Sequence, residues 1–93
     1  MAGTTRNLDP AAEEHYLQAL ASLRRYDSEA SVGGAIHLLE QLAASDGDGA
    51  RVRAALGRAY LYKYRITKQR TWEARAAGAI EAALDLDPDL MEV

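Results

Sequence analysis

The stretch "LGRAYLYKYRITKQRTW", residues 56–72, decides the fold that the chain is expected to adopt. Its first half carries leucine, alanine and tyrosine at spacings of three and four residues, and a basic, polar run then separates it from the next apolar segment. Such spacing predicts an amphipathic helix that buries one face. The polar run raises the question of whether it serves as a binding site.

Working outward from this stretch, three further segments show the same helical spacing. One helix is expected from about Pro10 to about Arg25, because an Asp-Pro pair supplies a capping carboxylate and a proline suited to the first turn. The others are expected from a cap at Ser28 or Ser31 to about residue 44, from residue 48 or 49 into the polar run, and from a cap at Thr71 to about residue 86. Four amphipathic helices with short connections predict an all-α fold with antiparallel neighbours.

The composition narrows the class of protein. The chain has 93 residues, enough for one small domain, and no cysteine, which excludes disulfides, thiolate metal sites and thiol redox chemistry. Nine arginines against two lysines favour a bacterial source with a GC-rich genome. The N-terminal segment lacks the apolar core of a signal peptide, and no segment approaches the roughly 20 apolar residues of a membrane span. A cytoplasmic protein is therefore expected.

A weak internal repeat spans the two halves of the chain. Four positions recur 41 residues apart: Ala35 aligns with Ala76, Leu39 with Ile80, Leu42 with Ala83, and Gly47 with Pro88. A period between 20 and 50 residues is typical of helical repeat proteins, in which each helix pair buries its apolar face against the next pair.

The second copy resembles the tetratricopeptide repeat (TPR) family, whose helix pair reads W-x2-L-G-x2-Y, then A-x3-F, then a proline. The matching residues are Leu56, Gly57, Tyr60, Ala76, Ile80, Ala83 and Pro88. Small residues at Gly57 and Ala76 are expected to let the two helices approach closely, with Tyr60 and Ile80 filling the space beside them. Arg53 stands where the family favours tryptophan, and about seven extra residues separate Gly57 from Ala76, which is about two helical turns.

The resemblance implies a short right-handed α-solenoid of about four helices. It divides the chain into a flexible N-terminus (1–9), a first repeat (10–47), an elongated second repeat (48–87) and the start of a further helix (88–93). The extra residues are expected to lengthen both helices of the second pair, so that "KYRITKQRTW" forms a protruding hairpin tip.

Charge is distributed unevenly along the chain. The net charge is −3, but it divides into −5 for residues 1–50, +7 for residues 51–75 and −5 for residues 76–93. One interpretation is that the basic segment pairs with its acidic neighbours across exposed rims, where each pair contributes at most about 1 kcal/mol. The other is that the basic segment presents a surface to an acidic peptide.

The resemblance selects the residues of such a surface, because in this family the first helix of each pair lines a concave groove. The expected partner-binding residues are Arg51, Arg58, Leu61, Tyr62 and Arg65, with Lys68 and Arg70 extending the basic surface. Nucleic acid is the third interpretation, which the negative net charge and the lack of a recognised motif disfavour.

No pattern in the chain favours catalysis, a cofactor or a metal. His15 and His37 lie in different predicted helices, each without a second ligand at metal-binding spacing. The "DGDGA" segment at residues 46–50 lacks the glutamate that closes a calcium loop. Gly33 and Gly34 lack the strand and the further glycines of a phosphate loop. We therefore expect a non-enzymatic protein without a cofactor.

Two functions remain open. The first is a protein–protein interaction module, or scaffold, that binds a partner peptide or helix in its groove. The second is a self-assembly element, because two repeats leave an apolar end uncovered and "LDPDLMEV" carries the Asp-Pro signal of a further helix. Homo-oligomer contacts are expected at Leu90, Met91 and Val93.

Overall fold

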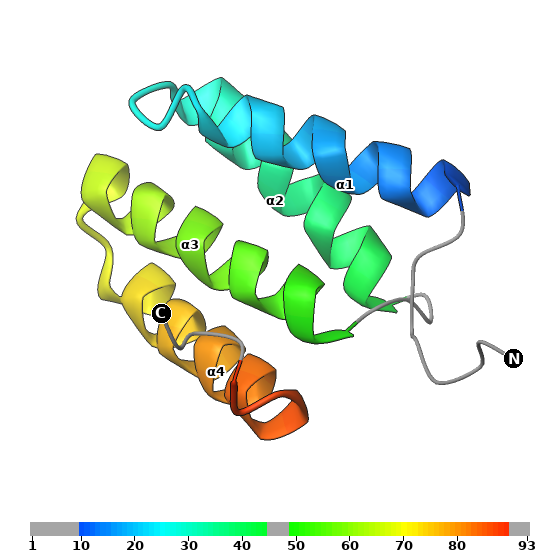
Figure 1. Cartoon of the computed structure of the whole chain (residues 1–93). Helices are drawn as coiled ribbons and strands as arrows, with labels where there is room; N and C mark the ends of the chain where they lie inside the picture. Colours follow the sequence, from blue (N-terminus) through cyan, green and yellow to red (C-terminus); the bar gives the residue numbers. More distant parts are fainter. Residues whose placement is uncertain (1–9, 45–48, 90–93) are drawn as a thin grey trace, which may run out of the picture.

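Four helices make up the structure, a computed structural model that describes residues 10–44 and 49–89. They are α1 (Pro10–Leu23), α2 (Glu29–Ala44), α3 (Gly49–Thr67) and α4 (Arg70–Leu86), and the described residues contain no strand (Figure 1). Consecutive helices run antiparallel, as their short connections require. The predicted all-α fold of stacked helix pairs is confirmed.

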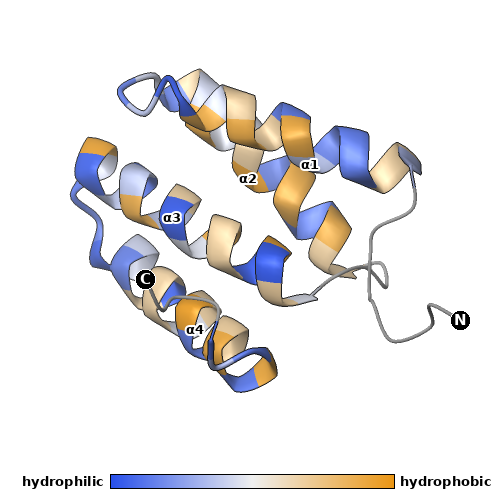
Figure 2. Ribbon diagram, viewed as in Figure 1, coloured by the Kyte–Doolittle hydropathy of each residue, from blue (hydrophilic) through white to orange (hydrophobic). Residues whose placement is uncertain are grey.

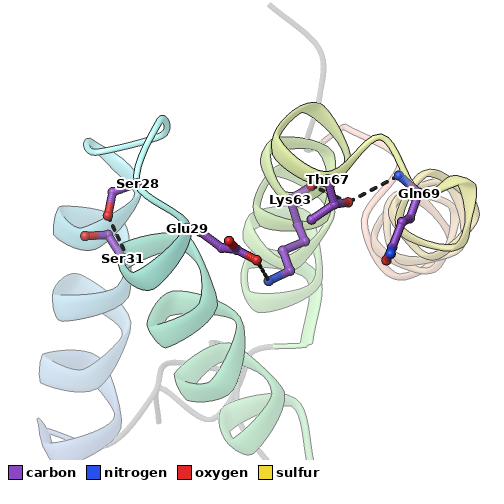
Figure 3. Close-up of polar contacts among 6 residues, drawn as sticks. All are labelled: Ser28, Glu29, Ser31, Lys63, Thr67 and Gln69. Carbon is purple, nitrogen blue, oxygen red and sulfur yellow. Dashed lines mark hydrogen bonds and ion pairs between the residues drawn. The ribbon is translucent and has the colours of Figure 1, made fainter.

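The start of α2 shows which serine acts as the cap. The Ser28 hydroxyl accepts a hydrogen bond from the backbone N–H of Ser31 at 3.2 Å, which is the N-cap arrangement (Figure 3). Ser28 therefore caps the helix, and Ser31 lies within its first turn.

The start of α4 differs from the prediction. Gln69 occupies the N-cap position and its side chain makes no capping bond, whereas Thr71 lies inside the first turn, so the predicted cap at Thr71 is wrong. A different threonine organises this turn. The Thr67 hydroxyl donates to the backbone carbonyl of Lys63 at 2.9 Å and accepts from the N–H of Gln69 at 3.2 Å (Figure 3).

The polar run that follows Tyr62 is mostly helical. Residues 63–67 belong to α3 and residues 70–72 to α4, which leaves only Lys68 and Gln69 as the connection. Lys68 adopts a left-handed conformation with φ of 62°, and its N–H donates to the carbonyl of Tyr64 at 2.6 Å. This is the usual geometry just after a helix end, where glycine is the preferred residue.

The helices pack in chain order. The contacts run from α1 to α2, from α2 to α3 and from α3 to α4, and α1 also touches α3. Within residues 10–44 and 49–89, the backbone of α4 contacts neither α1 nor α2. The α3–α4 pair is therefore attached to the α1–α2 pair through α3.

The core lies mainly between α2 and α3. Its largest fully buried side chains are Leu39 and Val32 from α2 and Val52 from α3. Every helix carries hydrophobic and hydrophilic residues on different faces (Figure 2). No polar or charged residue of the described ranges is buried, which avoids the cost of removing polar groups from water.

The close approach of α3 and α4 follows the sequence-based expectation. Gly57 is buried and Ala76 is 1% exposed, while Tyr60 fills the space beside them at 7% exposure. A Cβ atom at Gly57 would lie 2.5 Å from Cγ1 of Ile80 and 3.4 Å from the carbonyl oxygen of Ala76. Only glycine fits at this position without movement of the Ile80 side chain.

Several predictions concern segments outside the described residues. These are the flexible N-terminus (1–9), the boundary between the two repeats (45–48) and the oligomer contacts at Leu90, Met91 and Val93. Just before the last segment, the carboxylate of Asp87 accepts a hydrogen bond from the N–H of Asp89 at 3.2 Å, a turn typical of aspartate. No helix in the described part of the chain is long and apolar enough to cross a membrane. The bacterial and cytoplasmic assignments stay predictions.

Candidate functional site

One face of α3 remains open, although neighbouring helices surround the rest of it. This face carries Arg58 and Arg65, both exposed, with Leu61 and Tyr62 half-buried between them. Spacings of three, four and seven residues place the four side chains on one side of the helix. We call these four residues the α3 stripe.

Arg51 begins the same face of the helix but is engaged by α1. Its Nη2 atom lies 3.3 Å from Oε2 of Glu13, and its guanidinium carbon lies 4.5 Å from the centre of the Tyr16 ring. Burial alone would lower the pKa of Arg51, but hydrogen bonds and favourable charge from Tyr16 and Glu13 raise it overall. The structure therefore brings together four of the five predicted surface residues and directs Arg51 to an internal contact.

An aromatic pair extends the stripe toward the α1–α2 connection. The rings of Tyr62 and Tyr26 lie 5.7 Å apart between centres and are tilted by 44°. Tyr26 is 59% exposed, and Leu17 of α1 is 54% exposed. Sequence analysis missed Tyr26, because nothing in the local pattern shows that residues 26 and 62 meet.

Most cations of residues 51–75 other than Arg51 are either in contact with a neighbouring side chain or exposed. Lys63 pairs with Glu29 of α2 at 3.1 Å, and both Lys63 and Arg75 lie over the Trp72 ring, at 5.6 and 5.3 Å from its centre (Figure 3 shows the Lys63–Glu29 pair). The exposed cations Arg58, Arg65, Lys68 and Arg70 make no side-chain hydrogen bond or ion pair with any described residue. Part of the basic segment is thus internally paired, and part faces outward.

Tyr60 forms a polar link beneath this surface. Its hydroxyl donates to Oε2 of Glu40 at 2.7 Å, and its ring lies 5.8 Å from that of Trp72. Burial raises the pKa of Tyr60 to about 12, and the hydrogen bond to Glu40 acts in the same direction. The shift moves the phenol away from neutral pH, which suits a structural link between α2, α3 and α4 rather than acid–base chemistry.

The residues considered for other chemistry are scattered. His15 is exposed on α1 and His37 is exposed on α2, and no cluster of metal-ligating side chains occurs among residues 10–44 and 49–89. Gly33 and Gly34 lie inside α2 rather than in a loop. The "DGDGA" turn falls largely outside the described residues.

No protein-family model, no curated protein and no solved structure matches the chain. On the exposed surface, the α3 stripe combines two cations, a tyrosine that pairs with Tyr26, and a partly covered leucine.

Proposed function

We propose that the chain is a non-enzymatic protein–protein interaction module of the TPR type, and that its α3 stripe binds an acidic peptide or helix from a partner protein. The observation that carries the proposal is that Arg58 and Arg65 are available for binding. Both are exposed, both lack an acidic partner in the described part of the chain, and they flank Leu61 and Tyr62. Two free cations on either side of an apolar centre suit an interface with charged ends.

The chemistry of the stripe favours carboxylates. Arginine presents a planar fork of donors that can bind a carboxylate through two hydrogen bonds. Seven residues of helix separate Arg58 from Arg65, a distance of about 10 Å. Two acidic side chains seven residues apart on a partner helix, or about three residues apart on an extended peptide, match this distance.

The aromatic pair supplies the apolar part of the proposed contact. Tyr26 and Tyr62 present adjoining rings, with Leu61 half-buried next to Tyr62 along the helix. Tyrosine and arginine are enriched among the residues that dominate binding energy at protein interfaces. We therefore expect the bound segment to combine acidic residues with at least one apolar side chain.

The packing of the α3–α4 pair supports the TPR assignment. The small residues of the motif, Gly57 and Ala76, are buried and lie near each other between the two helices, and Tyr60 is buried beside them. In that family the first helix of each pair lines the groove, and these helices here are α1 and α3.

A peptide-display selection from a random library tests the proposal. The wild-type chain should enrich sequences rich in aspartate and glutamate, whereas the Arg58→Glu/Arg65→Glu variant should lose them and favour basic sequences. The matched control is Arg24→Glu/Arg75→Glu, which makes the same charge change at exposed residues outside the stripe. Circular dichroism of each variant checks that the helices are retained. Identical selections by the wild type and the Arg58/Arg65 variant would overturn the proposal.

A further inference from the structure

The outward side of α4 carries a second ordered surface, distinct from the stripe in the proposed function. Its residues recur at three- and four-residue spacing and are all exposed: Arg70, Ala74, Ala77, Gly78, Glu81 and Asp85. None of their side chains makes a hydrogen bond or ion pair with the rest of the described chain. We call this set the outer face of α4.

The charges on the outer face oppose the helix dipole. The N-terminal end of a helix favours acidic groups and its C-terminal end favours basic groups, each by about 0.3–1 kcal/mol. Here Arg70 stands at the first position of α4, while Glu81 and Asp85 lie near its last turn, which holds no basic residue. Glu73 in the first turn does match the dipole. Arg70, Glu81 and Asp85, however, do not stabilise α4 as an isolated helix, and a partner helix of opposite charge order could use them.

A second copy of the same helix is such a partner. We propose that the chain self-associates by antiparallel packing of two α4 helices about a two-fold axis between Ala77 and Gly78. Seven and a half residues separate this point from Arg70 and from Asp85, so each Arg70 would lie beside the partner's Asp85, with the partner's Glu81 one turn away. Rotation about this axis therefore brings opposite charges together at both ends of the helix pair.

The middle of the face permits close contact. Ala74, Ala77 and Gly78 have short side chains or none, and a Cβ atom at Gly78 would meet nothing within 4 Å. The pairing also sets the two helix dipoles antiparallel, so that each Arg70 lies near the negative end of the other helix. A single helix pair makes a small interface, so the association should be concentration-dependent and weakened by salt.

Sedimentation velocity over about 10 µM to about 1 mM, a range suited to a small interface, tests the pairing. The wild type should form dimers, whereas Arg70→Glu and the double variant Glu81→Arg/Asp85→Arg should each raise the dissociation constant by at least about tenfold, because like charges then face each other. Mixing the two variants should restore association as a 1:1 heterodimer. The control Arg58→Glu/Arg65→Glu should dimerise normally, which separates this proposal from the α3 stripe.

A cysteine probe tests the position of the axis, since the chain has no cysteine of its own. Ala77→Cys, next to the axis, should form a disulfide-linked dimer on mild oxidation, whereas Gln41→Cys, exposed on α2, should not. A wild type that stays monomeric throughout, a dimer that survives both charge reversals, or equal cross-linking at the two positions would each overturn the proposal.

Discussion

At Tyr60, a single side chain joins three helices. Its hydroxyl donates to Glu40 of α2 at 2.7 Å, and its ring contacts Trp72 of α4. The resemblance to the TPR motif predicted that Tyr60 would fill the space between α3 and α4, but it could not predict the bond to Glu40, which lies 20 residues earlier in the chain. The bond depends on how far α2 stands from α3, a property of the packed core.

The Tyr60→Phe substitution should lower the free energy of unfolding at pH 7 by about 1 kcal/mol, the usual net value of one hydrogen bond. Glu40 is exposed and can still bind water, so no buried group is left unpaired. The measurement is urea denaturation followed by circular dichroism. An unchanged midpoint would mean that the hydrogen bond adds nothing to stability.

The same residue should make stability depend on pH in the alkaline range. Its pKa is about 12 in the folded state, against an ordinary value of about 10 in the unfolded chain. Between these values the folded state holds a proton that the unfolded state has released, so this stabilisation is present below pH 10 and falls as pH rises toward 12. Urea midpoints measured across this window should fall more steeply for the wild type than for Tyr60→Phe, and parallel curves would contradict the assignment.

Gly57 and Gly34 provide a matched pair of glycines within helices. A Cβ at Gly57 would collide with Ile80, so Gly57→Ala should destabilise the protein by about 1–3 kcal/mol, as overpacking usually does. A Cβ at Gly34 meets nothing within 4 Å, so Gly34→Ala should stabilise by about 0.5–1 kcal/mol through helix propensity alone. Chemical denaturation should give opposite signs for the two variants, and equal signs would place the helices further apart than described.

The sequence predicted that all four helices exist, but it placed some of their ends less accurately. The helix through Tyr60 was predicted to continue into the polar run after Tyr62, and α3 does extend to Thr67. Residues 63–67, which have mostly charged or polar side chains, remain helical because α4 packs against α3. Thr71 was a reasonable cap by residue type, but the two-residue connection starts α4 earlier, at Arg70.

The end of α3 provides a prediction about the connection. Lys68 has φ of 62°, a conformation that costs a non-glycine residue roughly 1–2 kcal/mol. Lys68→Gly should relieve this strain and, after the entropic cost of glycine, raise the free energy of unfolding by up to about 1 kcal/mol. Its control is Gln69→Gly, at a residue with φ of −92°, which should lower stability by about 0.5–1 kcal/mol. A loss of stability in Lys68→Gly would contradict the left-handed conformation.

Over the whole molecule, stability depends on the interface between α2 and α3. Leu39 is fully buried there, and among the described helices α3 makes all the backbone contacts between the α3–α4 pair and the α1–α2 pair. A chain of 93 residues is expected to have a total stability of about 5–14 kcal/mol. The loss of one large core side chain therefore removes a substantial part of it.

Leu39→Ala should destabilise the protein by about 2.5–5 kcal/mol through lost burial and the cavity that remains. The control is Leu17→Ala on α1, whose side chain is 54% exposed and should change stability by no more than about 0.5 kcal/mol. Thermal and urea unfolding of both variants measure the difference. Similar losses in the two variants would show that the core does not lie where the helices place it.

The sequence by itself determined that the chain is helical, how many helices it forms, and which of their faces are buried, because apolar spacing and helix breakers act over a few residues. It also indicated the basic face of α3. Only the tertiary structure decided which cations on that face are available, since Arg51 and Arg58 lie two turns apart on one helix yet, within residues 10–44 and 49–89, only Arg51 meets an acidic side chain. The contact of Tyr26 with Tyr62 depends on tertiary structure in the same way. Distances between side chains on different helices are set by the packed core, and no local pattern records them.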